Sequence, residues 1–287
     1  MSRIYDCFCY FNEDMLLELR FETLWQSVDY FVISEASYTH AGKPRATEFD
    51  IGKFEKYASK IRYIRLDKRP DGLNDFWKNE NFIRNNIIDG LHDAQDDDLV
   101  LISDLDEIPK PEAIEKFDAK RYLRGDFCQR YYSYYLNNFW VGDVDPSGNL
   151  QPKSNVWHGS KITTYKNFIN FFAGNASQVR IYKSSGILRG IKRAWFKLFN
   201  NQLIQDGGWH FTWVFSIQDI IKKIESTAHQ EFNSHDRKDP ERIVTLIRSG
   251  RDLNKPQARY QLQDIDGQFP PYLLANLEKY RSYLLSR

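Results

Sequence analysis

Three carboxylates lie close together in the segment Ser103-Asp104-Leu105-Asp106-Glu107. The segment follows the apolar residues 99–102, which do not alternate with polar ones and therefore predict a buried strand of a parallel sheet. Asp104 and Asp106 are two positions apart, so their side chains can point the same way in an extended chain. Three negative charges this close repel one another unless a cation joins them, and Mg²⁺ and Mn²⁺ prefer oxygen ligands. The segment therefore predicts a site for a divalent cation.

A second candidate site is the stretch Asp206-Gly207-Gly208-Trp209-His210. Two glycines let the backbone turn sharply or approach a ligand closely. We expect a turn here, with His210 at the start of an aromatic strand over residues 209–215. A lone histidine is more often structural than functional, but the neighbouring acid, glycines and tryptophans make a functional role about equally plausible.

Glu80 and Arg84 are four residues apart on a predicted helix over residues 77–91. The spacing favours an ordinary surface ion pair. The alternative is an arginine that points from this helix toward a phosphate beside the acidic segment.

Residues 146–205 contain no Asp or Glu, but they contain nine Lys and Arg residues. This run creates a local positive field. Within it, residues 187–199 have apolar side chains on one helical face and basic side chains on the other. The pattern favours an ordinary helix packed on the protein. A lid over an anionic donor and a contact with an anionic membrane surface are the two alternatives.

The order of predicted elements indicates an α/β fold. Strands are expected over residues 4–10, 30–34, 61–66 and 99–104, and helices over residues 14–25, 51–59 and 77–91 lie between them. This alternation is typical of a parallel sheet wrapped by helices, which binds ligands at the carboxyl ends of its strands. Helices are also expected over residues 111–117, 217–226, 240–248 and 271–285, and a long strand over residues 126–135.

Composition narrows the function classes. A chain of 287 residues suits one large domain, and a net charge of +1 gives no general case for a nucleic-acid partner. Cys7, Cys9 and Cys128 have no standard zinc spacing and are expected to be buried free thiols in a reducing compartment. The sequence shows no apolar run of signal-peptide or membrane-span length, so we expect a cytoplasmic protein, with peripheral contact at the inner membrane face as the alternative.

Several stretches together resemble glycosyltransferase family 17, which contains the enzymes that add bisecting N-acetylglucosamine. The matching stretches are Asp6-Cys7-Phe8, Asp29-Tyr30-Phe31-Val32-Ile33, Gly42-Lys43-Pro44, Ile102-Ser103-Asp104-Leu105-Asp106-Glu107-Ile108-Pro109, Gly208-Trp209-His210-Phe211 and Ile247-Arg248-Ser249-Gly250 with Asp252-Leu253. The animal members carry a membrane anchor before the catalytic part. Because this chain begins almost directly at its first predicted strand, we expect a microbial or viral relative, or a trimmed catalytic domain.

The resemblance implies a GT-A-like fold with residues 1–110 as the nucleotide-sugar half and residues 111–287 as the half that binds the acceptor and completes the metal site. It implies inverting transfer, in β linkage, of a sugar such as N-acetylglucosamine from a UDP-sugar to a glycan on a protein, lipid or polysaccharide. Asp104 and Asp106 then match the motif that holds Mn²⁺ or Mg²⁺ on the donor diphosphate, with His210 as a further ligand and His229 in reserve. The donor contacts implied are Glu35 to the uridine, and Arg84 and Lys43 to the ribose or phosphates.

Inverting transfer needs a base to accept the proton of the acceptor hydroxyl. The acid-free run leaves Asp206, Glu107 and Glu231 as candidates, and we favour Asp206 because it precedes His210 by four residues. Glu107 could instead support the metal ligands or be a third ligand.

Two other function classes fit parts of the pattern. An aspartyl-phosphate phosphatase would use Asp104 as its nucleophile, but such enzymes usually carry Thr or Val where this chain has Ile108. A carbohydrate-binding module with a structural cation would account for the aromatic content of 15%.

Overall fold

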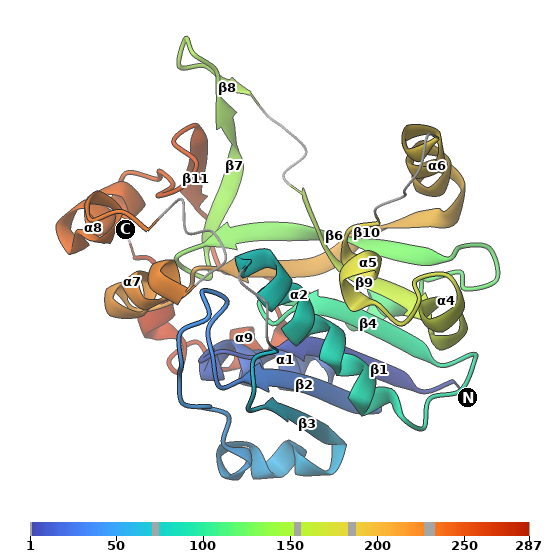
Figure 1. Ribbon diagram of the computed structural model, residues 1–287. Helices are drawn as coiled ribbons and strands as arrows, with labels where there is room; N and C mark the ends of the chain where they lie inside the picture. The colour runs from blue at the N-terminus through green and yellow to red at the C-terminus, as the bar shows by residue number, and fades with distance from the viewer. Residues whose placement is uncertain (1, 71–74, 152–155, 183–187, 227–232, 287) are drawn as a thin grey trace.

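The structure is a computed structural model that describes residues 2–70, 75–151, 156–182, 188–226 and 233–286. Its described strands form one 11-stranded sheet (Figure 1). The order along the sheet is β11-β7-β6-β9-β4-β1-β2-β3, while β10 pairs with β5 and β6, and β8 pairs with β7.

The N-terminal half of the sheet is parallel, as predicted. Its strands are β1 (Ile4–Cys9), β2 (Tyr30–Ala36), β3 (Ile61–Leu66) and β4 (Leu99–Asp104). β1 lies between β2 and β4, and Cys9 pairs in register with Ser34 on one side and with Asp104 on the other. The polar segments that follow these apolar strands therefore leave the sheet at one edge.

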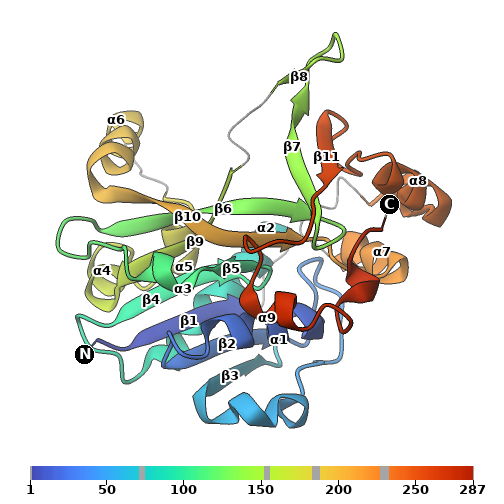
Figure 2. The same cartoon turned by 180° about the vertical axis from the view of Figure 1, so that it is seen from behind.

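Helical segments connect the parallel strands because each crossover must return the chain to the opposite edge. They are α1 (Asp14–Leu24), the 3₁₀ segment η1 (Ile51–Lys60), α2 (Phe76–Asn85) and the 3₁₀ segment η2 (Asn86–Leu91). The side chain of Asp75 caps α2 by accepting from the backbone N–H of Lys78 at 3.1 Å. α1 and α9 cover one face of the sheet, and α2, α4 and α5 cover the other (Figures 1 and 2).

The rest of the sheet is mixed in direction, which confirms the predicted α/β class with a mixed C-terminal part. Its strands are β5 (Glu107–Pro109), β6 (Arg124–Ser133), β7 (Asn138–Val144), β8 (Leu150–Gln151), β9 (Val156–Thr164), β10 (Asn201–Thr212) and β11 (Ala258–Leu262). β9 runs antiparallel to both β4 and β6, whereas β10 runs parallel to β6 and antiparallel to β5.

Short helices complete the fold. They are α3 (Pro111–Ile114), α4 (Tyr165–Asn170), α5 (Ala176–Arg180), α6 (Arg189–Trp195), the π-helix η3 (Phe196–Asn200), α7 (Ile217–Ser226), η5 (Asp236–Lys238), α8 (Pro240–Arg248), α9 (Pro271–Ala275) and η6 (Arg281–Tyr283). α7 and α8 have the predicted bounds. The single helix predicted over residues 271–285 is wrong, because the chain there forms α9 and η6 with a break between them.

The predicted turn at Gly207-Gly208 is also wrong. Both glycines lie inside the long strand β10, where the register with β6 shifts between Ile204 and Gly208. Gly208 has a φ of 125°, and a Cβ atom there would lie 2.2 Å from the carbonyl oxygen of Ile108. The glycines therefore allow a β-bulge and a close approach to β5, without reversing the chain.

Cys7, Cys9 and Cys128 are free thiols, with Cys7 and Cys128 buried and Cys9 partly exposed. Among the described helices, none has the length and apolar character needed to cross a membrane.

Candidate active site

A pocket of about 460 Å³ opens where the parallel strands end. The chain leaving β1 contributes Tyr10 and Phe11, and the chain leaving β2 contributes Tyr38 and His40. Asp104, at the end of β4, lies in the same pocket together with Asp106. The position follows from the topology, because open α/β sheets bind ligands at the carboxyl ends of their strands.

Two arginines hold the carboxylate of Asp104. Arg84 on α2 donates from Nη2 to Oδ1 at 2.9 Å, and Arg180 at the end of α5 donates from Nη2 to Oδ2 at 2.8 Å. Burial disfavours the charged form of Asp104, but the guanidinium groups of Arg180 and Arg84 outweigh that effect and hold its pKa well below the ordinary value. Asp104 is therefore an anion at any physiological pH.

Arg84 forms the predicted pair with Glu80 and also reaches the acidic segment. It donates to Glu80 at 2.7 Å in the predicted i,i+4 pair and also contacts Asp104. The side chain is mostly buried and lines the pocket, so the pair is not an ordinary surface pair.

The backbone of the acidic segment is fixed by Arg20 on α1. This fully buried side chain donates from Nη1 to the carbonyl oxygens of Leu105 at 3.1 Å and Glu107 at 2.8 Å. It also forms a buried ion pair with Asp6 on β1, at 2.5 Å. A buried guanidinium has enough donors to hold a carboxylate and a tight turn together, so it sets the directions of the two site aspartates.

Glu107 is also buried, and its carboxylate accepts hydrogen bonds inside the protein. It accepts from the backbone N–H of Asp104 at 3.0 Å, from Trp157 Nε1 at 2.7 Å and from Arg180. Glu107 does not line the pocket. The structure therefore supports the option in which Glu107 positions Asp104, and it gives no access for Glu107 to act as a base.

Asp106 faces His210 across the pocket wall. His210 Nε2 lies 3.4 Å from Asp106 Oδ1, because β5 and β10 pair with His210 opposite Glu107. Burial disfavours the charged form of Asp106, yet the nearby imidazole outweighs it and lowers the pKa of Asp106. His210 Nδ1 is buried, and no described residue forms a hydrogen bond with it.

Aromatic rings form the wall of the pocket beside His210. The ring centroid of Tyr131 lies 5.0 Å from that of His210 and 5.7 Å from that of Trp157, while Trp157 lies 4.9 Å from His210. Lys255 Nζ lies 5.9 Å from the centroids of both Tyr131 and Trp157. Such a wall presents flat apolar faces beside charged groups, which suits the faces of a sugar ring.

Asp252 is a further pocket carboxylate, which the sequence analysis did not select as a site residue. Its Oδ1 accepts from the backbone N–H groups of Asn254 and Lys255, both at 2.7 Å, and its Oδ2 accepts from the Tyr260 hydroxyl at 2.9 Å. The pKa of Tyr131 is raised, first by burial and then by the negative charge of Asp252, with Asp106 acting in the same direction. Tyr260, which donates to Asp252, has its ring centroid 6.4 Å from that of Tyr131, so Asp252 lies beside the aromatic wall.

Other predicted site residues lie away from this pocket. Asp206 is exposed and pairs with Lys110 at 2.6 Å, so the predicted proximity of this base to His210 is not found. Lys43 is exposed and does not line the pocket. Glu231 and the reserve ligand His229 lie outside the described residues.

Glu35 has a structural environment in place of the expected contact with the uridine. It is fully buried and accepts from the backbone N–H groups of Glu48 at 2.8 Å and Phe49 at 3.1 Å. The Tyr63 hydroxyl donates to it at 2.8 Å, and Arg45 pairs with it at 2.9 Å. Glu35 thus anchors the segment after β2 to the sheet.

The donor set of the pocket suits a divalent cation that is shared with a substrate. The described part of the chain holds no group of three or more His, Cys, Asp or Glu side chains that could hold a metal alone. Mg²⁺, however, is commonly bound by one or two carboxylates plus substrate phosphates. Three side chains fit this second arrangement: Asp106, His210, whose Nε2 lies 3.4 Å from Asp106 Oδ1, and Asp104, whose side chain is 41% exposed.

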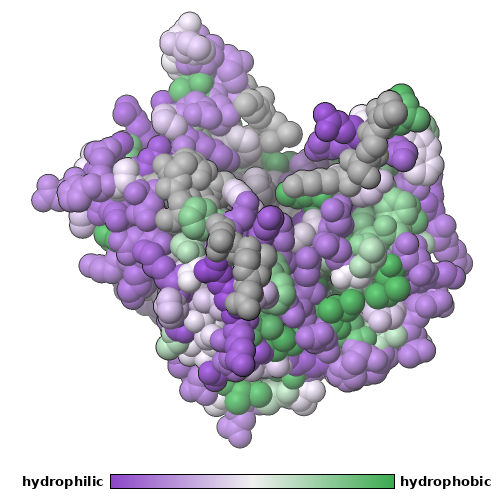
Figure 3. All heavy atoms as spheres, in the orientation of Figure 1, coloured by the Kyte–Doolittle hydropathy of each residue, from purple (hydrophilic) through white to green (hydrophobic). Residues whose placement is uncertain are grey.

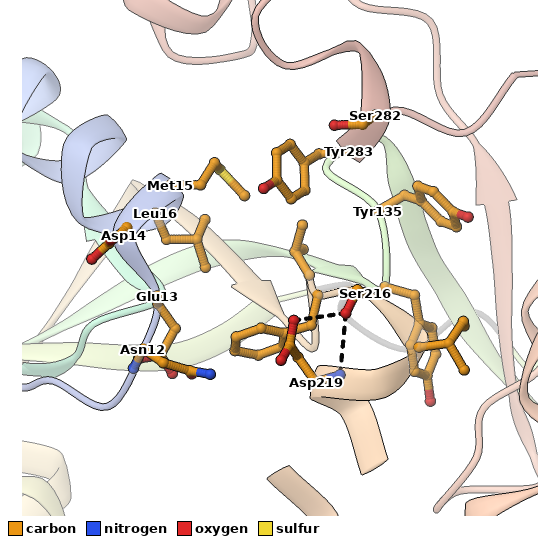
Figure 4. A pocket seen from close by; sticks show the side chains of 14 residues that line it. Asn12, Glu13, Asp14, Met15, Leu16, Tyr135, Ser216, Asp219, Ser282 and Tyr283 are labelled. Carbon is orange, nitrogen blue, oxygen red and sulfur yellow. Dashed lines mark hydrogen bonds between the residues drawn. The ribbon is translucent and has the colours of Figure 1, made fainter. Parts of the chain in front are cut away.

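A smaller pocket of about 380 Å³ lies between the start of α1 and the start of α7 (Figure 4). Ser216 and Asp219 lie on its wall, where Ser216 Oγ accepts from the Asp219 backbone N–H at 3.2 Å and donates to the Asp219 carboxylate at 2.6 Å. These bonds cap α7 and account for the polar groups there as structural.

Comparison with known proteins connects this geometry to a family. Three curated relatives, the β-1,4-mannosyl-glycoprotein 4-β-N-acetylglucosaminyltransferases of Rattus norvegicus, Mus musculus and Homo sapiens, are each 26% identical over 292 residues. The matches cover 96% of this chain and 53% of each relative, so the chain spans about half their length.

Two solved structures resemble the chain in fold. A 4-diphosphocytidyl-2C-methyl-D-erythritol synthase matches with a TM-score of 0.41 and 12% identity, over 71% of this chain and 89% of that one. The apo-form glycosyltransferase GlyE of Streptococcus pneumoniae TIGR4 matches with a TM-score of 0.34 and 9% identity, over 70% of this chain and 45% of that one.

The profile of glycosyltransferase family 17 matches residues 1–134, the part of the chain that contains the parallel half of the sheet and the acidic segment. Together with the relatives that align along nearly the whole chain, this match confirms the predicted resemblance of the chain to glycosyltransferase family 17.

Proposed function

We propose that this protein transfers N-acetylglucosamine from UDP-N-acetylglucosamine to a glycan acceptor, with inversion to a β linkage and with Mn²⁺ or Mg²⁺ bound. The proposal is carried by one observation: Asp104, Asp106 and His210 line one pocket at the carboxyl edge of the sheet, in a chain that resembles this family. The relatives named above supply the choice of sugar and the linkage.

The acidic side of the pocket suits a sugar diphosphate. Asp104 and Asp106, with His210, would hold the cation, which supplies charge to stabilise the departing UDP. Arg84 lines the pocket, balances the charge of Asp104 through Nη2 and can offer further N–H donors to phosphate oxygens. The aromatic side chains at the ends of β1 and β2, Tyr10, Phe11 and Tyr38, provide faces for the nucleoside.

We assign the general base to Asp252. Among the pocket carboxylates, Asp104 and Glu80 pair with arginine and Asp106 faces His210. Glu13 pairs with Lys223 at 3.6 Å, whereas the groups that donate to Asp252 are uncharged, namely two backbone N–H groups and the Tyr260 hydroxyl. Asp252 also lies beside the aromatic wall, because the ring centroid of Tyr260 is 6.4 Å from that of Tyr131. There it can accept the proton from an acceptor hydroxyl as the new glycosidic bond forms.

The phosphatase alternative is weaker because the chain resembles glycosyltransferases along nearly its whole length and carries Ile108 where such phosphatases usually have Thr or Val. The carbohydrate-binding alternative shares the aromatic wall, but its structural cation would need protein ligands alone, and the described residues hold no group of three or more His, Cys, Asp or Glu side chains that could supply them.

The central test measures UDP binding by calorimetry with and without Mn²⁺, followed by a screen of nucleotide sugars for slow hydrolysis. We expect UDP to bind only with the cation and UDP-N-acetylglucosamine to be hydrolysed fastest. Asp106→Asn should abolish both signals, while Asp145→Asn, a control at an exposed turn, should keep them. Equal UDP binding with and without Mn²⁺, or full turnover by Asp106→Asn, would overturn the proposal.

The base assignment has its own test. Asp252→Asn should lower kcat by ~100-fold or more, as expected for loss of a general base, and leave UDP binding unchanged. Glu13→Gln is the matched control and should keep kcat within a few-fold. If Glu13→Gln loses kcat and Asp252→Asn does not, Asp252 is not the base.

A further inference from the structure

Residues 188–199 project from the protein and expose most of their apolar side chains. Five large apolar residues there are between 53% and 71% exposed: Leu188, Ile191, Trp195, Leu198 and Phe199. In Figure 1 the helix α6 stands at the upper right, and Figure 3 shows hydrophobic atoms at the tip of that projection. A soluble protein rarely leaves this many neighbouring large apolar side chains in water without a partner.

One aromatic residue attaches this projection to the body of the protein. Phe196 is 2% exposed and stacks on Tyr182, with ring centroids 4.3 Å apart, and on Phe171, with centroids 5.6 Å apart. The guanidinium of Arg124 lies 5.0 Å from its ring centroid. Because Phe196 alone of residues 188–199 is buried, the segment is anchored but not packed, and the expectation of an ordinary packed helix is wrong.

The position of the segment also argues against a lid over the pocket. It leads directly into Asn201, the first residue of β10, while His210 lies nine positions further along the same strand. At about 3.3 Å per residue this places the segment ~30 Å from His210. No residue of 188–200 lines the pocket.

Charge identifies the kind of surface that the segment fits. Arg189, Lys192, Arg193 and Lys197 alternate with its exposed apolar residues, and the surrounding run 146–205 has no acidic residue. A protein partner would have to bury five large apolar side chains and neutralise four cations within residues 188–199. An anionic bilayer provides both, because its phosphates meet the cations while its acyl chains accept the apolar side chains. The indole of Trp195 suits the interface between the two.

We infer that residues 188–199 dock the protein on an anionic phospholipid surface. The segment then holds the protein peripherally on the bilayer, with β10 as the rigid connection between the lipid surface and the candidate active site. This inference rests on exposure and charge and does not depend on the proposed transfer reaction.

The test is co-sedimentation of the full chain with vesicles of phosphatidylcholine alone and of phosphatidylcholine with phosphatidylglycerol. The wild-type protein should bind the anionic vesicles at least tenfold more tightly, and raised salt should weaken that binding. Trp195→Glu with Leu198→Glu should abolish binding, and Arg193→Gln with Lys197→Gln should remove the preference for anionic lipid.

The matched control is Leu150→Glu with Leu277→Glu, which changes two exposed apolar side chains elsewhere on the protein. It should bind vesicles like the wild type. Absence of wild-type binding to anionic vesicles overturns the inference and leaves an acidic protein partner as the better explanation. Equal loss of binding in the control variant overturns the assignment to residues 188–199.

Discussion

At the scale of single residues, the candidate site is organised by arginines as much as by its acids. Arg180 bridges Asp104 and Glu107, and Arg20 fixes the backbone between them. Each guanidinium reaches several acceptors in fixed directions, which a lysine could not do. The acidic segment therefore keeps its shape without a bound cation.

Replacing Arg180 should destabilise the protein. Arg180→Met leaves Glu107, which is fully buried, without its charged partner, so we expect the free energy of unfolding to fall by about 3 kcal/mol. Urea unfolding followed by circular dichroism measures this change. Arg281→Met removes an exposed ion pair with Glu278 and should cost less than ~0.5 kcal/mol. Similar losses in the two variants would contradict the importance of the buried bridge.

The buried side chain of Lys161 should make the free energy of unfolding depend on pH in the alkaline range. It lies 3.3 Å from Asp126, and burial lowers its pKa to about 8 although Asp126 opposes the shift. In the unfolded chain the lysine binds its proton up to about pH 10.4, so between pH 8 and 10.4 the unfolded state holds more protons and stability rises with pH. Lys161→Met should remove a gain of roughly 2 kcal/mol between pH 7.5 and 10, which urea unfolding of both proteins at these pH values would measure. Parallel pH profiles for the two proteins would show that the folded and unfolded lysine have the same pKa.

Sequence reasoning at this scale works for residues next to a strand end and fails for long-range partners. Asp104 and Asp106 lie in the pocket because the strand order determines where β4 ends, and Arg84 reaches the pocket from α2. Arg180 donates to Asp104, which lies 76 positions earlier in the sequence. The carboxylate of Glu35 accepts hydrogen bonds from backbone N–H groups 13 and 14 positions later in the sequence. No local pattern indicates these contacts, so Arg180 and Asp252 were missed and Glu35 was given a donor contact that its burial does not support.

At the scale of elements, β10 connects the two parts of the site. It brings His210 opposite Glu107 through its pairing with β5, and its bulge lets the backbone approach Ile108. The Gly-Gly pair was expected to form a turn, because two glycines most often mark one. The pairing of β10 with two strands overrides that preference, which explains why the strand begins at Asn201 rather than near Trp209.

Because of the bulge, we expect alanine substitutions at Gly208 and Gly267 to differ strongly in their effect on the stability of the protein. Gly208→Ala places a Cβ atom 2.2 Å from the Ile108 carbonyl at a φ of 125°, so β5 and β10 must separate. We expect a loss of at least ~2 kcal/mol in stability, together with lower turnover because His210 moves. Gly267→Ala, where no atom lies within 4 Å of the added Cβ, is the control and should unfold within ~0.5 kcal/mol of the wild type. A stable Gly208→Ala protein would contradict the geometry of the bulge.

At the scale of the whole molecule, the parallel half of the sheet and β6, expected over residues 126–135, were predictable, whereas most of the other strands were not. Each parallel strand is a short apolar run between segments with helical spacing, so all four parallel strands could be predicted from the sequence. β7, β9 and β11 carry charged, aromatic and glycine residues without a regular period, so their pairing arises only from tertiary contacts.

If the protein and the donor diphosphate share the cation, the melting temperature should rise strongly only when both the cation and UDP are present. Mn²⁺ alone should shift the melting temperature little, because Asp104 is already paired with two arginines. UDP with Mn²⁺ at about 100 times the dissociation constant should stabilise the protein by about 2.7 kcal/mol, or ~5 °C or more. Differential scanning fluorimetry with Mn²⁺, UDP, both, and both plus a chelator would measure this. A full shift with Mn²⁺ alone would mean that the protein holds the metal without the diphosphate.

The sheet order also has a consequence for the time course of synthesis. β4 is complete at Asp104, but its second neighbour, β9, begins only at Val156. A ribosome adding 5–20 residues per second needs roughly 3–10 s for that interval. During this interval one edge of the apolar strand β4 has no partner strand, and such an edge is a template for aggregation. A nascent chain stopped near residue 110 should therefore need a chaperone to stay in solution, and the parallel half should become protease-resistant only after β9 has left the exit tunnel.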